Sequence, residues 1–177
     1  MPQRTQSEFV IEPFDKKKHN RTAFSCEHEA LVQSLKQQAS QDIQRRVAAV
    51  FVLTRDGSRI AGYYTLSQYA VRLSSVPDEI IKRFNLPHYQ ELPATLLGRL
   101  ARDLDFKGQG IGELLLMAAL RQALAQSRLI ASMAVITDAK DQKAKAFYAS
   151  YGFIELPDHF NRLFLPMETV EQMFTSP

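Results

Sequence analysis

The sequence predicts a single α/β domain over residues 1–177, built on a mixed sheet with helices on both faces, and three observations support this. Apolar strand-like segments alternate with helical segments over residues 94–156, which favours β-helix-β steps and parallel neighbouring strands. Two strand-like segments at 47–55 and 59–73 flank an Asp-Gly-Ser turn, which predicts an antiparallel hairpin. A chain of 177 residues is long enough to bury one sizeable core without disulfides.

The first half of the chain should hold the hairpin, one earlier strand and two helical regions. The stretch 26–46 contains few helix-breaking residues, and Ala30, Leu31 and Leu35 form an apolar stripe at helical spacing. Pro77 suits the first turn of a short helix. The expected elements outside the hairpin are a strand (8–14), a basic loop (15–21), one or two helices (26–46) and a short helix (74–84).

The second half should hold the β-helix-β steps and a final hairpin. Residues 114–120 carry no polar side chain, so the helix that contains them should be covered on most sides. The last segment, 167–174, reads as a short helix or a tail. The other expected elements are a strand (94–103), a helix (110–127), a strand (131–138), a helix closed by Gly152 (141–151) and a hairpin (152–157 and 162–167).

Composition and charge exclude several classes of protein. The contents of 45% hydrophobic and 23% charged residues are those of a globular domain. The one cysteine excludes an intramolecular disulfide framework and fits a reducing compartment. No stretch approaches a membrane span, and the first residues lack the apolar segment of a signal peptide, so we expect a cytoplasmic protein. A net charge of +3 permits a polyanionic partner without requiring one.

Three of the seven glycines, Gly108, Gly110 and Gly112, stand where a strand leads into a helix. The first N–H groups of a helix have no intrahelical partner, the helix dipole adds positive charge there, and glycine lets a phosphate approach the backbone. The spacing is not that of a Walker loop, and Glu113 excludes Gly-x-Gly-x-x-Gly. The glycines therefore predict an anion site, with a tight turn as the alternative.

These glycines lie in a stretch that resembles a known family. "KGQGIG" is similar to the pyrophosphate loop of the GNAT N-acetyltransferase superfamily, Arg/Gln-x-x-Gly-x-Gly/Ala, although Lys107 replaces Arg or Gln. The stretch 138–153, "DAKDQKAKAFYASYGF", resembles the acetyl-CoA-associated helix of that family, which ends in Phe-Tyr-x-x-x-Gly-Phe. The resemblance implies a GNAT-like, mainly antiparallel sheet with a central parallel pair, acetyl-CoA as co-substrate and no metal.

Further stretches resemble one branch of the superfamily. Residues 31–53, 59–71 and 96–112 are similar to the acetyltransferase toxins of bacterial type II toxin–antitoxin modules, and the likeness covers about residues 8–166. Such toxins acetylate the amino group of aminoacyl-tRNA and block translation. The resemblance therefore implies an aminoacyl-tRNA substrate, a ribbon-helix-helix antitoxin as partner and a homodimer.

Acetyl transfer from a thioester to an amine needs a site for the donor and stabilisation of the developing oxyanion. Backbone N–H groups at the end of strand 94–103 can meet both needs if that strand splays from its neighbour, and such donors are worth about 3–4 kcal/mol in other acyl transfers. Lys107 adds a point charge beside the pyrophosphate. By resemblance the residues that bind acetyl-CoA are Leu100, Ala101, Arg102, Lys107, Gly108, Gln109, Gly110, Ile111, Gly112 and Phe147.

Tyr148 is the expected catalytic residue. A phenol with a pKa near ~10 can protonate a nascent thiolate, whose conjugate thiol has a pKa near ~8.5. The alternative is a core tyrosine whose hydroxyl is merely satisfied, and the position of Tyr148 after Phe147 in the matched motif favours the catalytic role. Phe147 and Tyr151 are also assigned to packing.

The expected acceptor is an α-amine. Its pKa near ~8 leaves a useful neutral fraction, whereas a lysine amine near ~10.4 has a greater need of a base. Glu113 and Asp141, at helix starts, are explained by capping and by the helix dipole rather than as bases. Contacts with tRNA phosphates are expected from the N-terminal helices and one strand residue, with solvated surface charge as the alternative for the 15–21 loop. These contacts are assigned to Lys36, Arg45, Arg46 and Arg99.

Other reactive side chains are given structural roles. The four histidines show no metal-ligand spacing, and with one cysteine a structural zinc site is not expected. Cys26 is taken as an incidental thiol. Two alternative functions stay open: an N-acetyltransferase for a small amine or a protein N-terminus, and a non-catalytic acetyl-CoA-binding regulatory module, against which Tyr148 argues.

Overall fold

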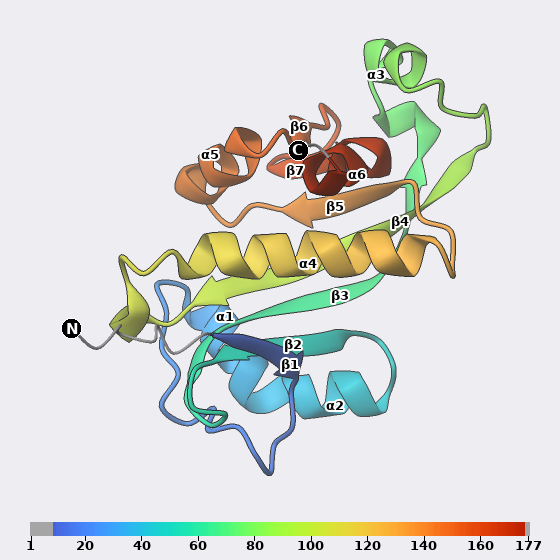
Figure 1. Ribbon diagram of the computed structural model, residues 1–177. Coiled ribbons are helices and arrows are strands. Elements are labelled where there is room, and N and C mark those ends of the chain that lie inside the picture. Colours follow the sequence, from blue (N-terminus) through green and yellow to red (C-terminus); the bar gives the residue numbers. More distant parts are fainter. Residues whose placement is uncertain (1–8, 176–177) are drawn as a thin grey trace. The chain divides into compact units, whose positions relative to one another are not determined.

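The structure is a computed structural model that describes residues 9–175, so Glu8, the expected start of the first strand, lies outside the described residues. Figure 1 shows the path of the chain. The helices and strands, in chain order, are β1 (Val10–Pro13), α1 (Glu29–Gln33), the π-helix η1 (Ser34–Gln38), α2 (Ala39–Gln44), β2 (Ala49–Thr54), β3 (Ile60–Arg72), the 3-10 turn η2 (Leu73–Ser75), α3 (Asp78–Arg83), β4 (Glu91–Arg102), the 3-10 turn η3 (Leu104–Phe106), α4 (Ile111–Ser127), β5 (Ala134–Asp138), α5 (Gln142–Ser150), β6 (Ile154–Glu155), β7 (Arg162–Pro166) and α6 (Met167–Thr175).

The strands form one seven-stranded mixed sheet in the order β1-β2-β3-β4-β5-β7-β6. The sheet is mostly antiparallel, and its parallel pair is β4–β5, in which Leu96 lies opposite Ile136. The predicted mixed sheet with a parallel pair is thereby confirmed. The second β-helix-β step was expected to give parallel neighbours too, and this is wrong. β7 inserts between β5 and β6 and pairs antiparallel with both, because the final hairpin folds back onto β5.

The chain forms two compact units, each made of two separate segments. Unit 1 comprises the chain up to Thr65 together with Arg99–Ala118, and unit 2 comprises Leu66–Gly98 together with the chain from Ala119 onward. Strands β3 and β4 and helix α4 each contribute residues to both units. The expectation of a single domain over residues 1–177 stays a prediction.

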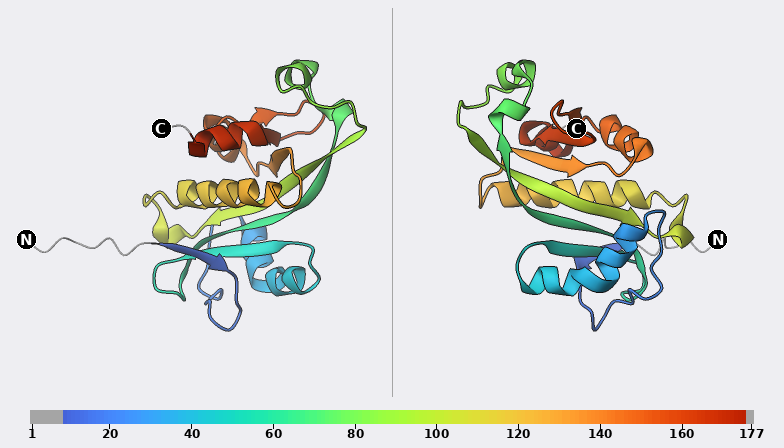
Figure 2. Two further views of the ribbon diagram at one scale, coloured as in Figure 1. Left: turned by 45° about the vertical axis from the view of Figure 1, so that its right-hand side comes forward. Right: turned by 180° about the vertical axis from the view of Figure 1, so that it is seen from behind.

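Unit 1 has a core between its helices and strands β2 and β3. Phe24, Leu35 and Val52 are each almost completely buried in it. Tyr63 on β3 lies edge-to-face against Phe24, and its hydroxyl donates to the carbonyl of Leu31 in α1 at 2.6 Å. Helix α2 lies beside β2 (Figures 1 and 2). This core holds the N-terminal helices against the hairpin that the sequence predicts.

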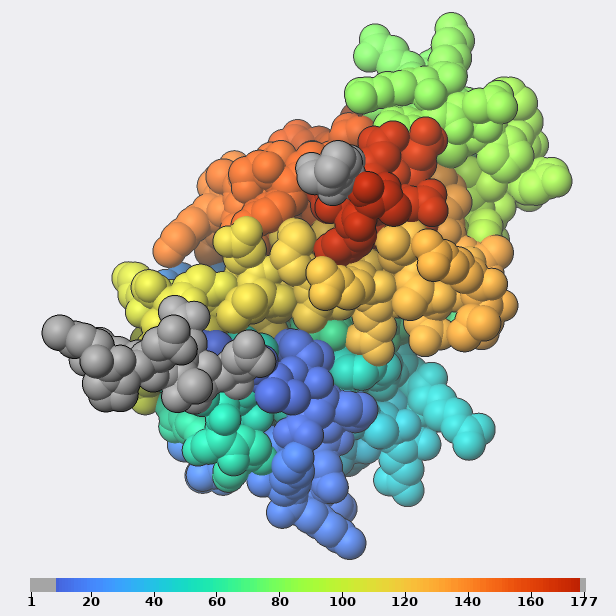
Figure 3. All heavy atoms as spheres, in the orientation of Figure 1, coloured from blue at the N-terminus to red at the C-terminus, as the bar shows by residue number. Residues whose placement is uncertain are grey.

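Unit 2 has a second core formed by β5, β7 and the segment that links β3 to β4. Ala134, Ile136 and Phe164 are buried there with Val71 and Leu92. The segment 73–90 carries α3 and forms a projection (green in Figure 3). Helix α3 starts near Pro77, as predicted, but Pro77 is its N-cap residue rather than part of its first turn, and no side chain caps the helix. Within residues 9–175 no helix is both long and apolar enough to cross a bilayer.

Element boundaries differ from the predictions by a few residues. β4 starts at Glu91 rather than at 94, and β5 starts at Ala134 rather than at 131. The delay of β5 follows from the end of α4, where the N–H groups of Leu129 and Ile130 still donate to Gln126. The segment 167–174 proves to be helix α6. Leu114 is 43% exposed although its neighbours Leu115 and Leu116 are buried, so α4 is covered on one side rather than on most sides at its start.

Candidate active site

The glycine loop, residues 107–112, lies in unit 1 between η3 and α4. Gly108 and Gly110 have φ values of +79° and +72°, and the carbonyl of Gly110 accepts the first helical bond, from the N–H of Leu114 at 3.1 Å. A Cβ at either glycine would meet nothing within 4 Å. The positive φ values therefore favour glycine at these two positions, and the space beside them, at the start of a 17-residue helix, is open to an approaching anion.

The other members of the predicted loop divide into side chains and backbone. Lys107 and Gln109 are exposed, whereas Ile111 is almost completely buried. Gly112 lies in the first turn of α4 and is half-buried. The structure thus brings the predicted loop residues together. The tight-turn alternative accounts for the positive φ at Gly108 and Gly110.

Gly62 on β3 sets how close the start of α4 lies to the sheet, and the sequence analysis missed it. A Cβ at Gly62 would lie 2.6 Å from Leu115 Cδ1, 2.9 Å from the carbonyl oxygen of Ala101 and 3.1 Å from Ile111 Cγ2. No side chain fits between β3 and α4 there without displacing a neighbour. A glycine within a strand is the signal that could have revealed this close approach.

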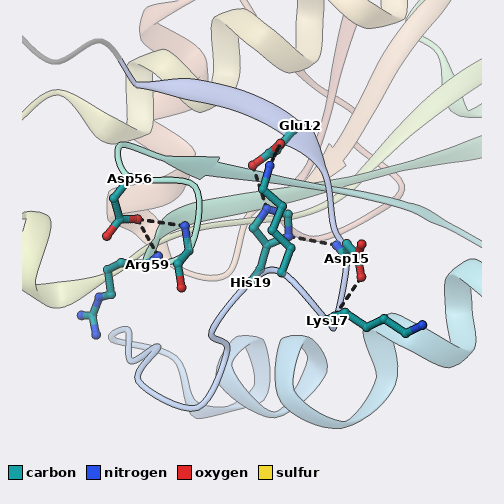
Figure 4. Close-up of polar contacts among 8 residues, drawn as sticks. Glu12, Asp15, Lys17, His19, Asp56 and Arg59 are labelled. Atoms are coloured by element: carbon teal, nitrogen blue, oxygen red, sulfur yellow. Dashed lines mark hydrogen bonds and ion pairs between the residues drawn. The ribbon is translucent and has the colours of Figure 1, made fainter.

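A buried carboxylate fixes the chain between β4 and the glycine loop. Asp103 is fully buried, and it accepts hydrogen bonds from the N–H groups of Ser25 and Asp105, each at 2.9 Å. The guanidinium of Arg59 lies 3.0 Å from Asp103 and 2.8 Å from Asp105. Arg59 sits at the hairpin turn, where Asp56 accepts from the N–H groups of Ser58 and Arg59 (Figure 4). These bonds fix the segment 103–105, which leads into the glycine loop, to the turn of the β2–β3 hairpin.

A second cation beside the loop was also missed. Nη2 of Arg55 donates to Oε1 of Gln109 at 3.2 Å, and the same guanidinium lies 4.3 Å from the ring centroid of Phe9. Arg55 is exposed and directly follows β2. Together with Lys107 it places two positive charges near the glycine loop, which favours an anionic ligand.

Strand β4 extends beyond its parallel pairing. The register joins Thr95, Leu96 and Leu97 of β4 to residues 135–137 of β5, and β4 then continues to Arg102. Ala101 is buried, and Leu100 and Arg102 are half-buried. This register is consistent with the predicted separation of β4 from β5 after Leu97. The backbone groups of residues 100–102 lie on the part of β4 beyond the pairs with β5.

The arginine side chains of this strand contact the N-terminal region of unit 1. Arg102 lies 3.6 Å from Glu27, and Arg99 lies 3.5 Å from both Asp42 and Gln38. Gln38 ends the π-helix η1, a rare element that often marks functional sites. Residues of α2 and η1 therefore hold the side chain of Arg99, which is predicted to contact the acceptor. Because the side chain of Arg102 is directed to Glu27, its backbone is the part left to contact acetyl-CoA.

Tyr148 lies in unit 2 on α5, the helix that carries the second matched motif. Asp141 caps the helix by accepting from the N–H of Ala144 at 2.7 Å, and Gly152 closes it with φ +94°. Both features were predicted. The Tyr148 side chain is 6% exposed, and burial raises its pKa to about 12. The Thr137 side chain opposes that rise of the pKa.

Aromatic rings surround the phenol. The ring of Phe147 lies 5.4 Å from that of Tyr148 and 5.2 Å from that of Tyr151, and the ring of Phe153 lies 5.3 Å from Tyr148. These edge-to-face contacts agree with the packing role assigned to Phe147 and Tyr151. Burial among aromatic rings is also what the core-tyrosine alternative requires, so the catalytic role of Tyr148 stays a prediction.

The predicted acceptor-binding cations all lie in unit 1. Arg45 and Arg46 are exposed directly after α2, and Lys36 is half-buried on η1. In the 15–21 loop, Lys18 lies 2.6 Å from Glu12. Lys16 and Lys17 are exposed. Polar contacts connect residues of this loop to one another and to β1 (Figure 4). Of its three lysines, Lys18 therefore has a carboxylate beside its ammonium group.

The remaining reactive side chains are engaged in structural contacts. The buried His19 accepts from the N–H of Asp15 at Nδ1, and its Nε2 lies 2.8 Å from Glu12, whose pKa is lowered first by this hydrogen bond (Figure 4). The thiol of Cys26 donates to the carbonyl of His28, and burial raises its pKa, which makes it a poor nucleophile. Between residues 9 and 175 no group of three or more His, Cys, Asp or Glu side chains is placed to hold a metal ion.

Comparisons with known proteins place these features in context. Residues 46–155 match the family described as "Acetyltransferase (GNAT) domain". The "tRNA-acetylating toxin" of Mycobacterium tuberculosis is 31% identical over 132 residues, which span 75% of this chain and 76% of that protein.

Two solved structures extend the comparison over nearly the whole chain. The structure of AtaT complexed with acetyl-methionyl-tRNAfMet matches with a TM-score of 0.85 and 29% identity, over 95% of this chain and 100% of that one. A tyrosine-to-phenylalanine mutant of AtaT, bound to the C-terminus of the antitoxin AtaR and to acetyl-CoA, matches with a TM-score of 0.80 and 26% identity, over 96% and 99% of the two chains.

Proposed function

Because the chain belongs to the GNAT acetyltransferase family, we propose that it is a toxin that transfers the acetyl group of acetyl-CoA to the α-amine of aminoacyl-tRNA and so blocks translation. The observation that carries this proposal is the similarity, over 95% of the chain, to AtaT in complex with acetyl-methionyl-tRNAfMet. The relative from Mycobacterium tuberculosis, a tRNA-acetylating toxin by name, supports the same acceptor. The acetyl-CoA in the mutant AtaT structure supports the donor.

In the proposed reaction the residues of unit 1 hold the donor. The N–H groups at the start of α4 bind the pyrophosphate, because the conformation at Gly108 and Gly110 exposes them and no Cβ obstructs the approach. Lys107 and Arg55 add positive charge. The backbone at Leu100, Ala101 and Arg102 binds the pantetheine and the thioester oxygen.

Tyr148 then serves as the general acid. The neutral α-amine attacks the thioester carbon, a C–N bond forms, and the C–S bond breaks with its electron pair passing to sulfur. The phenolic proton of Tyr148 passes to that sulfur, the amine loses its extra proton to solvent, and the phenolate recovers a proton from water. Protonation makes the departing sulfur a neutral thiol, and general acids of this kind contribute about 10²–10⁴ in rate.

The acceptor surface is assigned to unit 1. Arg45, Arg46 and Lys36 bind tRNA phosphates, and Arg99 contacts the acceptor end from β4, where Asp42 and Gln38 hold its guanidinium. An antitoxin partner of the ribbon-helix-helix class, a homodimer and a cytoplasmic location complete the proposal. The complex of AtaT with the antitoxin AtaR supports the first of these.

The experiment measures initial rates on a mixed pool of charged tRNA at two salt concentrations. Replacement of Lys36, Arg45 and Arg46 by glutamate should raise the KM for charged tRNA at least about tenfold and reduce the salt slope by roughly two to three, because each neutralised phosphate releases counterions. Acetyl-CoA affinity should hardly change.

A charge-matched control replaces Lys82, Arg83 and Arg128 by glutamate, which changes the net charge equally on surfaces of unit 2. An equal rise of KM in both variants would show a bulk charge effect and remove the assigned surface. A wild-type enzyme that acetylates small amines but no charged tRNA would replace this function by the small-amine alternative.

A further inference from the structure

We propose that Phe160 is a stacking platform for the terminal nucleobase of the charged tRNA. This residue lies in the hairpin tip, residues 156–161, which joins β6 to β7. It is 87% exposed, the highest fraction among the large hydrophobic residues in the described part of the chain. The inference rests on the proposed function, in which the aminoacyl end of a tRNA reaches Tyr148.

The hairpin tip is held by hydrogen bonds at its base. The N–H of Leu156 donates to the carbonyl of Arg162 at 2.9 Å, and the N–H of Arg162 donates to the carbonyl of His159 at 3.2 Å. The guanidinium of Arg162 binds both carboxylate oxygens of Asp138 at 2.8 and 3.0 Å, and its Nη1 donates to the hydroxyl of Tyr69. The exposed ring is therefore carried by a backbone with a defined conformation.

Asn161, the residue after Phe160, has two unfavourable features. Its φ of +64° lies in the left-handed region, which few residues other than glycine adopt. Its Oδ1 is buried and has no hydrogen-bond partner among residues 9–175, which is also unfavourable. Its carbonyl accepts from the N–H of Ala139 at 2.9 Å, which ties this residue to the loop between β5 and α5. Backbone strain is concentrated at ligand-binding sites, so Asn161 supports a binding role for the hairpin tip.

The hairpin tip lies beside the helix that carries Tyr148, and both belong to unit 2. Nζ of Lys145 lies 5.9 Å from the ring centroid of Phe160. Lys145 precedes Tyr148 by three residues on α5, which corresponds to about 4.5 Å along the helix axis. The amino acid of a charged tRNA is esterified to the ribose of the last nucleotide, so in the proposed reaction the base of that nucleotide must lie near Tyr148. Phe160 offers an exposed aromatic ring in that neighbourhood.

The charges around the ring favour a neutral planar group over a phosphate. The ammonium of Lys145 lies 2.7 Å from the carboxylate of Glu155, and Arg162 is paired with Asp138. Each of these two cations thus has a carboxylate beside it, which reduces its attraction for a phosphate. Bases at single-stranded RNA ends stack on aromatic side chains, and such a base is neutral and planar.

The neighbours of Phe160 argue against a protein partner at the ring. Asp158 and His159 are exposed and polar, and Asn161 is polar too. A protein-binding surface is expected to be a contiguous apolar patch. A single ring among polar side chains instead matches the size of one base.

The test compares Phe160→Leu with Phe160→Trp in the full chain. Leucine keeps an apolar side chain and removes the aromatic face, whereas tryptophan keeps an aromatic face. We expect leucine to raise the KM for charged tRNA about fivefold to a hundredfold, because stacking of one base contributes about that factor. Tryptophan should keep this KM close to the wild-type value, and the KM for acetyl-CoA should stay unchanged in both variants. Tyr89→Leu, at an aromatic residue of unit 2 that is 69% exposed, is the matched control and should change neither KM.

A second measurement needs no acetyl transfer. An uncharged RNA hairpin with the acceptor end of a tRNA carries 2-aminopurine in place of its last adenine, and the fluorescence of this base falls when the base stacks. The wild type and Phe160→Trp should quench the fluorescence, and Phe160→Leu should not.

Equal KM values for charged tRNA in Phe160→Leu and the wild type, or equal quenching by the two, would overturn the platform. A rise in the KM for acetyl-CoA alone would assign the ring to the adenine of the donor and would also overturn it, as would a change of oligomeric state with unchanged kinetics. An enzyme inert toward charged tRNA would overturn the proposed acceptor, and the fluorescence would still decide whether Phe160 stacks on a terminal base.

Discussion

The glycine loop at residues 107–112 and Tyr148 differ in the groups that carry their proposed chemistry. In the loop these groups are backbone N–H donors, beside two residues with positive φ and open space. At Tyr148 the group is one side-chain hydroxyl, on a residue that is less than a tenth exposed. The first site binds charge from solvent, and the second holds one proton away from it.

This difference decides what damages each site. A backbone site tolerates changes of neighbouring side chains but responds to conformation and to added charge. A buried phenol tolerates neither the loss of its oxygen atom, which carries the proposed chemistry, nor a change of shape in its packed surroundings. Substitutions at the two sites should therefore separate donor binding from turnover.

Tyr148→Phe should have the largest effect. It removes the proposed proton donor and keeps the ring, so we expect kcat to fall about 10²–10⁴-fold while acetyl-CoA affinity, measured by calorimetry, stays near the wild-type value. Tyr151→Phe, at the residue that directly follows α5, is the matched control and should keep kcat within about twofold. Equal turnover of the two variants would leave Tyr148 a core residue.

Gly110→Asp, in the glycine loop, should have the second-largest effect. It adds a negative charge where the pyrophosphate is proposed to bind, so the Kd for acetyl-CoA should rise at least about tenfold. Gly110→Asn is the control, because it has the same shape, tolerates positive φ and carries no charge. Equal affinities of the two variants would attribute the loss to conformation and argue against an anion site.

Gly62→Ala should affect stability more than chemistry. Its Cβ would lie 2.6 Å from Leu115 Cδ1 and 2.9 Å from the carbonyl oxygen of Ala101, so overpacking should lower the free energy of unfolding by about 1–3 kcal/mol. Chemical denaturation provides the measurement. Gly108→Ala is the control for loss of a glycine without a steric clash, since a Cβ there meets nothing within 4 Å and only the positive φ acts against it.

The smallest expected effect concerns pH: below pH 10, ionisation of Tyr148 should not change the reaction rate. Burial raises the pKa of Tyr148 to about 12, so the phenol stays protonated well above pH 10. The contribution of this residue to stability is complete below the unfolded-state pKa near ~10 and is lost as pH rises from there through about 12. The check is the pH–rate profile of the wild type and of Tyr148→Phe. A fall in the wild-type rate with a midpoint below pH 10, absent from Tyr148→Phe, would show that the phenol ionises too early for a buried group.

The sequence predicts the exposed site better than the buried one. Gly108 and Gly110 can be recognised from the sequence because a positive φ strongly favours glycine, and Asp141 and Gly152 mark the ends of α5 for similar local reasons. The hairpin around Gly57 follows from the same turn chemistry. These features depend on a few adjacent residues, which is why the sequence reveals them.

Features that depend on distant partners were missed. Gly62 matters only because α4 returns to lie against it, and Arg59 matters because its partner Asp103 follows 44 residues later. The position of β7 between β5 and β6 was missed for the same reason, since it is set by tertiary pairing rather than by local pattern.

The most direct test of the central claim identifies the acetylated atom. Wild-type protein, acetyl-CoA and a pool of charged tRNA are incubated, the aminoacyl groups are released, and mass spectrometry with fragmentation locates the acetyl group. The account predicts acetyl on the α-amine of at least one amino acid, and greatly reduced product with Tyr148→Phe. Acetylation of small amines or side-chain amines by an active enzyme, with no α-acetylated aminoacyl group from any tRNA, would contradict it.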